Sequence, residues 1–164
     1  MPDASPLNIR PKTPADDSRL IALWSDHFGA AFVVARGRRI EPAALDGFIA
    51  EERDKLLGAV TFERVGNEIE IVTLDSVVEN RGAGTALLEA VVARARAVGA
   101  RRVFLVTTND NIRALRFYQK RGFDMVAVHR GAVDAARKLK PEIPLAGNDG
   151  IPIRHEVEYE LRLA

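Results

Sequence analysis

Two glycines, Gly82 and Gly84, separate a strand-like apolar stretch from a helical pattern, and this junction limits the folds open to the chain. Apolar residues recur at helical spacing in the segment that follows, namely Leu87, Val91, Ala95 and Val98. The first NH groups of a helix have no intrahelical partner and lie at the positive end of its dipole. Because glycine lets the backbone approach a ligand closely, the junction predicts a main-chain site for phosphate oxygens. A tight connection that binds nothing would show the same spacing.

Strand and helix patterns alternate along the rest of the chain. Strands are predicted at residues 7–10, 48–52, 56–64, 68–78, 101–107, 123–129 and 156–163, and helices at 13–29, 83–99, 111–121 and 131–139. Short turns at 53–54 and 66–67 favour an antiparallel meander before the glycines. The continuous apolar run at 103–106 is instead typical of a strand that is covered on both faces and parallel to its predecessor. These patterns predict an α/β domain with a mixed sheet.

Two segments leave alternatives open. Residues 31–39 fit either a loop or a short strand, and their arginines fit either a solvated surface or contact with an anionic ligand. Either Asn109 or Asp110 can cap the helix at 111–121.

Composition narrows the functional classes. We expect one domain over residues 1–164, and the net charge of +1 gives no general reason to expect nucleic acid or an anionic membrane as a partner. The chain has no cysteine, which excludes disulfides, a thiol nucleophile and thiolate metal sites. No apolar window has the length of a signal or membrane-spanning segment, so a cytoplasmic protein is expected.

Two motifs at about 68–128 resemble the GNAT superfamily of acyl-CoA-dependent N-acyltransferases. They are Gly82-x-Gly84-Thr85-Ala86-Leu87-Leu88 and, after the next strand, Asn111-x-x-Ala114-x-x-Phe117-Tyr118-x-x-x-Gly122-Phe123. The resemblance implies an α/β fold of the α+β type, with a mixed, mostly antiparallel sheet of about seven strands flanked by helices. In such a sheet a splayed pair of parallel strands holds the cofactor. One departure is Glu79, where the family usually has Gln or Arg.

The resemblance also implies that acetyl-CoA is the co-substrate and that no metal takes part. Its pantetheine arm would lie between the splayed strands and its pyrophosphate at the glycine turn. The implied cofactor-binding residues are Leu74, Asp75 and Ser76 along the arm, Arg81, Gly82, Ala83, Gly84 and Thr85 at the pyrophosphate, and Asn111 and Ala114 beside the pantetheine.

The implied reaction is direct attack of an amine on the thioester, without a covalent enzyme intermediate. A carboxylate can take the proton of the amine, and a hydroxyl can protonate the departing thiolate. The resemblance assigns the hydroxyl to Tyr118 and aligns the base best with Glu68, and Glu70 is a second candidate because it shares a face of the same strand. Asp75, next to the proposed thioester position, is an alternative base or amine-binding group. An aromatic core residue and surface glutamates remain the plainer interpretations of these positions. The histidines show no spacing that suggests a metal site or a dyad.

The acceptor is expected to be the amine of a small molecule or a peptide, and a homodimer is compatible with the resemblance. The acceptor would lie against Trp24, His27, Phe28, Phe32 and the 36–39 segment, with residues 131–155 as a candidate lid. A dinucleotide-binding oxidoreductase is disfavoured because Leu87 occupies the third glycine position and a meander precedes the turn. A regulatory module that binds acyl-CoA with little transfer is the remaining alternative.

Overall fold

The computed structural model describes residues 6–78 and 81–164, so Glu79 lies outside the described residues. The strands are β1 (Asn8–Pro11), β2 (Val33–Ala35), β3 (Arg38–Ile40), β4 (Asp46–Glu52), β5 (Lys55–Val65), β6 (Glu68–Ser76), β7 (Arg102–Thr108), β8 (Asp124–His129) and β9 (Glu156–Arg162). The helices are α1 (Asp17–Phe28), α2 (Ala83–Ala97), α3 (Ile112–Lys120) and α4 (Ala132–Ala136). Short 3-10 turns occur at Pro14–Asp16, Pro42–Ala44 and Asn148–Gly150.

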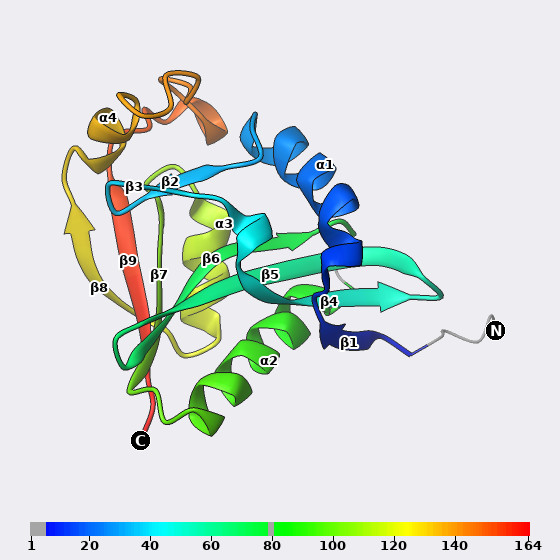
Figure 1. Cartoon of the computed structure of the whole chain (residues 1–164). Helices are drawn as coiled ribbons and strands as arrows, with labels where there is room; N and C mark the ends of the chain where they lie inside the picture. Colours follow the sequence, from blue (N-terminus) through cyan, green and yellow to red (C-terminus); the bar gives the residue numbers. More distant parts are fainter. Residues whose placement is uncertain (1–5, 79–80) are drawn as a thin grey trace.

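Seven strands form one mixed sheet in the order β1-β4-β5-β6-β7-β9-β8 (Figure 1). Every neighbouring pair in it is antiparallel except β6 and β7, which are parallel and joined through α2. The predicted sheet of about seven mostly antiparallel strands with one parallel pair is therefore confirmed.

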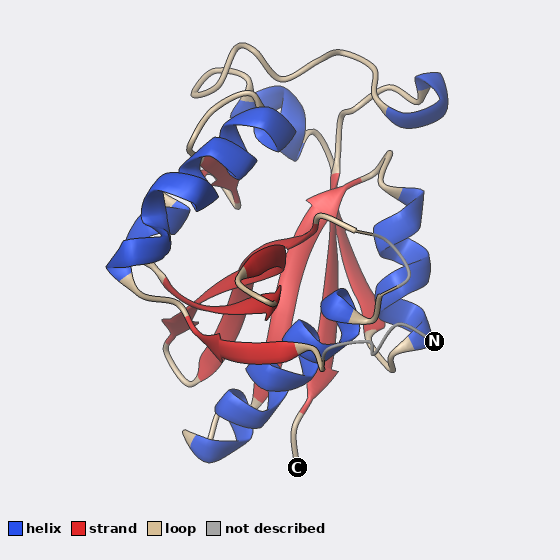
Figure 2. Cartoon of the chain, turned by 90° about the vertical axis from the view of Figure 1, so that its right-hand side faces the viewer, coloured by secondary structure: helices blue, strands red, loops and turns tan. Residues whose placement is uncertain are grey.

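Helices cover the two faces of the sheet (Figure 2). On one face, Leu87 and Val91 of α2 pack against Val60 of β5. On the other, Trp24 of α1 packs against Ala59, the neighbour of Val60 along the strand. Because successive side chains of a strand point to opposite faces, α1 and α2 lie on opposite sides of the sheet.

The parallel pair separates soon after it forms. Pairing between β6 and β7 is limited to Ile69 with Val103 and Glu70 with Phe104, although both strands continue beyond these residues. Two residues after Glu70, Val72 is inserted as a β-bulge, because Ile71 pairs with Phe62 and Thr73 pairs with Thr61. Bulges bend a strand and increase its twist, so the bulge accompanies the opening of a gap between the two strands.

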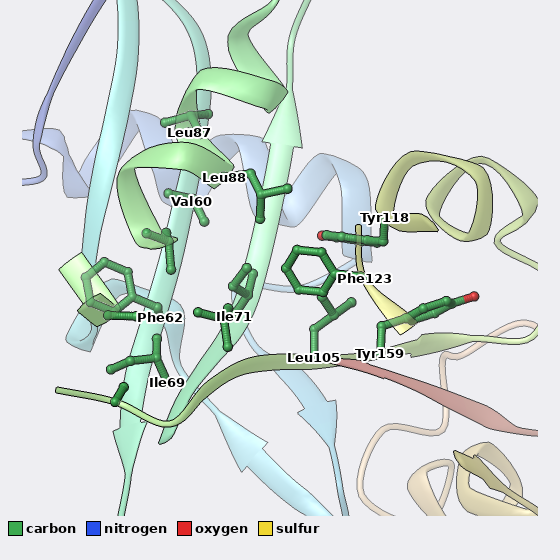
Figure 3. Packing of buried hydrophobic residues seen from close by; sticks show 14 of the residues in the cluster. Val60, Phe62, Ile69, Ile71, Leu87, Leu88, Leu105, Tyr118, Phe123 and Tyr159 are labelled. Atoms are coloured by element: carbon green, nitrogen blue, oxygen red, sulfur yellow. The ribbon is translucent and has the colours of Figure 1, made fainter. Parts of the chain in front are cut away.

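An aromatic group closes the core beside this gap (Figure 3). The ring of Tyr118 in α3 lies 5.4 Å from that of Phe123 and 5.9 Å from that of Tyr159 in β9, measured between centroids. The hydroxyls of the two tyrosines point in opposite directions in Figure 3. These contacts fix α3 against the sheet and so determine where its side chains face.

Three local predictions need correction or completion. Residues 31–39 form part of the separate hairpin β2–β3, and the helix predicted at 131–139 is shortened to α4. The N-cap of α3 is Asn111, whose Oδ1 accepts a hydrogen bond from the Ala114 amide at 3.0 Å. Asn109 and Asp110 were the wrong choices because their side chains hold the 145–155 connection instead. Asn109 Oδ1 accepts from the His155 amide, and Asp110 Oδ2 accepts from the Asn148 amide.

In the part of the chain that the structure describes, no helix has the length and apolar character required to cross a membrane.

Candidate active site

Two cavities meet at the gap between β6 and β7. Cavity A, of about 590 Å³, lies among α1, the hairpin strand β2, α4 and the 140–144 segment. Cavity B, of about 620 Å³, lies between the end of β6 and α3. The residues that line both are His27, Leu74, Asp75, Asn111, Ala114 and Tyr118. A molecule in one cavity can therefore reach a molecule in the other at these side chains.

Cavity B is strongly basic along its helical wall. Arg113, Arg116 and Lys120 of α3 line it, together with Arg121 at the C-cap of that helix and Ser76 at the end of β6. Asn111 holds the start of this wall, because its Nδ2 donates to Thr107 Oγ1 of β7 at 3.2 Å while its Oδ1 caps the helix. Such a surface suits a ligand with several negative charges.

The glycine turn borders the same cavity. Gly82 is the N-cap of α2 and has a φ of 76°, a left-handed conformation that favours glycine. Gly84 lines cavity B, and a Cβ added there would lie 3.4 Å from Phe117 Cε2. The absence of a side chain at Gly84 therefore keeps the start of α2 open to a ligand.

The other residues predicted at the turn have partners within the protein. Arg81 Nη2 donates to Glu52 Oε1 at 2.7 Å, and Ala83, the first residue of α2, is buried in the core. Thr85 Oγ1 accepts hydrogen bonds from Arg121 Nη2 and Nε, at 2.7 and 3.0 Å. These three side chains do not line either of the two cavities, as the described residues delimit them.

Tyr118 lies at the junction of the cavities with 6% of its surface exposed. Burial, and in second place the charge of Asp75, raise the pKa of Tyr118 well above its usual value, while Arg121 acts in the opposite direction. The hydroxyl therefore keeps its proton at neutral pH. Among the described residues it has no hydrogen-bond partner, which leaves the proton available to a ligand.

Asp75 lies at the same junction and is only 7% exposed. Its Oδ1 is 3.1 Å from Nδ1 of His27, and its Oδ2 accepts a hydrogen bond from Trp24 Nε1 at 3.2 Å. Burial raises the pKa of Asp75 above its usual value, although the contacts with His27 and Trp24 act against that rise. The His27 side chain is 37% exposed, so it links the buried carboxylate to solvent.

Sequence reasoning missed the contact between His27 and Asp75, which are 48 positions apart. The available signal was that His27 shares a face of α1 with Leu20 and Trp24, both fully buried. A histidine on the buried face of a helix is brought to the sheet that the helix covers.

Glu68 and Glu70 are engaged in ion pairs elsewhere on β6. Glu68 contacts the guanidinium groups of Arg101 and Arg102. Glu70, 1% exposed, accepts hydrogen bonds from Arg36 Nη2 and Nε at 2.8 and 3.1 Å. Burial alone would raise the pKa of Glu68, but its arginine contacts outweigh burial and leave that pKa below its usual value. Neither glutamate lines cavity A or cavity B in the part of the chain described.

The described residues contain no group of three or more histidine, aspartate or glutamate side chains arranged to hold a metal ion.

Comparison with known proteins gives three informative matches. YdhI, an uncharacterized protein of Bacillus subtilis (strain 168), is 41% identical over 141 residues, which cover 85% of this chain and 88% of YdhI. A Bacillus subtilis acetyltransferase solved in complex with CoA aligns with a TM-score of 0.70 at 20% identity, over 97% of this chain and 100% of that one. NAA60 of Arabidopsis thaliana, solved in complex with a bisubstrate analogue, also gives 0.70 at 20% identity, over 96% and 98% of the two chains.

A family model identifies the family of this chain. Residues 12–123, more than half of the chain, match the model of the acetyltransferase (GNAT) family. The chain belongs to the GNAT family, and the resemblance indicated by its two motifs is confirmed.

Proposed function

We propose that the protein transfers an acetyl group from acetyl-CoA to a primary amine of a small molecule or peptide. The observation that carries the proposal is the junction of cavities A and B, where Asp75 and Tyr118 line both. One cavity would hold the thioester and the other the amine, so that the two reacting atoms meet beside a carboxylate and a hydroxyl.

Cavity B is the proposed site for acetyl-CoA. The pantetheine arm would follow Leu74, Asp75 and Ser76 in the gap, where β6 no longer pairs with β7. The pyrophosphate would bind at the start of α2, where Gly84 leaves the backbone amides accessible. The basic side chains of α3 supply positive charge for the remaining phosphate. Arg81 and Thr85 would take part only by exchanging their present partners.

The proposed base is Asp75. A general base works best when its pKa approaches the operating pH, and burial shifts Asp75 in that direction. The attacking amine gives its proton to Asp75, and the contact with His27 offers that proton a path to solvent. Glu68 and Glu70, the bases predicted from the sequence, are weaker candidates because arginines occupy their oxygens and neither lines cavity A or cavity B among the described residues.

Tyr118 is the proposed acid. As the amine nitrogen bonds to the carbonyl carbon, the C–S bond breaks and the sulfur takes the proton of the Tyr118 hydroxyl. The products are an amide and CoA with a free thiol, and the tyrosinate regains a proton from solvent or from Asp75. Because this hydroxyl has no competing partner among the described residues, it can donate to the sulfur directly.

The test is release of free CoA thiol from acetyl-CoA across a panel of amines, with the acetylated amine identified by mass spectrometry. We expect release that depends on the amine and that falls sharply in Tyr118→Phe. Binding of acetyl-CoA without amine-dependent release would contradict transfer and favour a regulatory acyl-CoA-binding module.

A further inference from the structure

Lys140 is the only lysine or arginine that lines cavity A among the described residues. Its side chain is almost entirely enclosed, with 5% of the residue exposed. Buried lysines normally pair with a carboxylate, because an uncompensated charge is costly away from water. The surroundings of Lys140 are therefore informative about what cavity A binds.

Lys140 lacks such a partner within the described residues. Its Nζ donates one hydrogen bond, to the carbonyl oxygen of Phe32 at 2.9 Å, and lies 5.0 Å from the centre of the Phe32 ring. No carboxylate oxygen of those residues lies within 4.0 Å of it, and Glu142, which acts on it only through longer-range attraction, is exposed to solvent. An ammonium group has three N–H donors, so two remain for a ligand.

The segment that carries Lys140 is firmly held. Arg137, three residues earlier, donates hydrogen bonds to the carbonyl oxygens of Pro144 and Ile153, both at 2.6 Å, and to that of Ile143 at 3.2 Å. The amide of Lys140 itself donates to Ala136 at 2.9 Å. The ammonium group is therefore fixed in place before any ligand arrives, which lowers the entropic cost of binding.

The other charges of cavity A complement this lysine. Three carboxylates line the same cavity: Asp75 and Glu156 are buried, whereas Glu142 is exposed to solvent and forms no ion pair with Lys140. Glu156 Oε1 accepts a hydrogen bond from the Arg36 amide at 3.3 Å. Carboxylates attract the ammonium form of an incoming amine, whereas Lys140 attracts an oxyanion. Apolar side chains form much of the remaining wall, including Phe28, Val33 and Ile153.

We infer that the acceptor is an amine that also carries an oxyanion, a carboxylate or a phosphate, which binds to Lys140 while the amine reaches Asp75. The inference rests on the proposed function, since it identifies cavity A as the acceptor site. It predicts selectivity for amino acids or phosphorylated amines over simple amines. Lys140 contributes to binding and makes no contact with the reacting atoms.

The experiment uses matched pairs of amines that differ by the oxyanion. The pairs are 4-aminobutyrate with butylamine, phenylalanine with phenethylamine, and O-phosphoethanolamine with ethanolamine. Thiol release at saturating acetyl-CoA gives KM and kcat for each. The two carboxylate pairs and the phosphate pair separate the two sources of the oxyanion. We expect the acidic member of at least one pair to have a KM lower by about ten- to a hundredfold, as for one charge-assisted hydrogen bond.

The variant is Lys140→Met, which keeps an unbranched side chain as far as Cε and removes the ammonium group, and the matched control is Lys138→Met at an exposed position two residues away. Lys140→Met should abolish the preference by raising the KM of the acidic member, with kcat nearly unchanged, whereas Lys138→Met should retain it. Melting temperatures of both variants show whether the fold is intact. A preference that survives Lys140→Met would overturn the inference.

A second experiment measures binding and does not require turnover. Titration of N-acetyl-4-aminobutyrate and N-butylacetamide into the protein saturated with CoA should show tighter binding of the acid, and only in variants that keep Lys140. Equal binding of the two probes, or turnover of simple amines with no preference for acidic partners, overturns the inference and leaves acetyl transfer intact. Failure of every amine to release thiol, with the acid still bound through Lys140, counts against transfer alone. If no acidic probe is bound or used, the inference is wrong.

Discussion

The carboxylates at the two ends of strand β6 have opposite electrostatic environments. At its beginning, where β6 pairs with β7, Glu68 and Glu70 are matched by arginines. At its end, where the strands have parted, Asp75 contacts a histidine and an indole NH, and no arginine or lysine lies within 4.0 Å of it among the described residues. The comparison indicates that paired strands bring stabilising charges together, whereas the gap leaves a carboxylate whose charged form is disfavoured.

The largest effect that would test this contrast is expected from Asp75→Asn. The amide keeps an oxygen for the hydrogen bond from Trp24 but cannot take a proton, so turnover should fall by about 10²- to 10⁴-fold. Affinity for acetyl-CoA, measured by calorimetry, should change little. Glu68→Gln is the matched control at the other end of the strand. Loss of turnover in the control with normal turnover in Asp75→Asn would reverse the assignment of the base.

A smaller loss is expected from Tyr118→Phe, which keeps the ring packed against Phe123 and Tyr159. Removal of the acid should lower turnover by about a hundredfold under conditions where chemistry limits the rate, because the thiolate must leave unprotonated. Acetyl-CoA affinity should stay near that of the parent. Weak binding together with normal turnover would show that Tyr118 only shapes the site.

At the paired end of β6 the expected effect is on stability. Glu70→Gln removes the counter-charge of Arg36 and Arg38 in a buried position, and should lower the free energy of unfolding by about 1–3 kcal/mol. Turnover per folded molecule should change little. Chemical denaturation of parent and variant measures the difference. An unchanged midpoint would mean that these ion pairs contribute nothing to the fold.

The smallest effect is a difference in pH dependence. The folded-state pKa of Asp75 is raised, so its charge destabilises the fold above that pKa, and Asp75→Asn should melt higher than the parent at neutral pH. The folded-state pKa of Glu68 is lowered, so it stabilises the fold above its unfolded pKa and loses that effect as pH falls, and Glu68→Gln should melt lower at neutral pH.

The difference in melting temperature from the parent is positive for Asp75→Asn and negative for Glu68→Gln at neutral pH. Both differences should shrink as pH falls to the acid range. Melting scans between neutral and acid pH provide the measurement. Differences of the same sign in the two variants would refute the proposed contrast between the ends of β6.

Much of the fold could be predicted because its signals are local. The helix pattern after Gly84 and the apolar run at 103–106 were enough to identify the parallel pair, and the motif from Asn111 to Tyr118 located the helix that faces it. The N-cap of α3 was missed because the competing side chain of Asp110 is used by Asn148, a partner 38 positions away.

The site was less predictable because its chemistry depends on packing. Nothing local to His27 indicates that α1 crosses the sheet where β6 ends, and nothing local to Glu68 indicates that Arg101 and Arg102 neutralise it. The roles of Tyr118 and Asp75 stay predictions until the variants are measured.

The bulge at Val72 reverses which face of the sheet each later side chain of β6 points to. In an uninterrupted strand, Asp75 would project on the same side as Ile69 and Ile71, which pack in the core beneath α2. The one inserted residue moves Asp75 to the other side, where its pairing partner Ala59 packs against α1. The orientation of this carboxylate is therefore set by how many residues precede it in the strand. Deletion of one residue of the strand before position 75 would turn this carboxylate to the other side of the sheet. The site would then lose the carboxylate as completely as by substitution, although the aspartate would remain in the sequence.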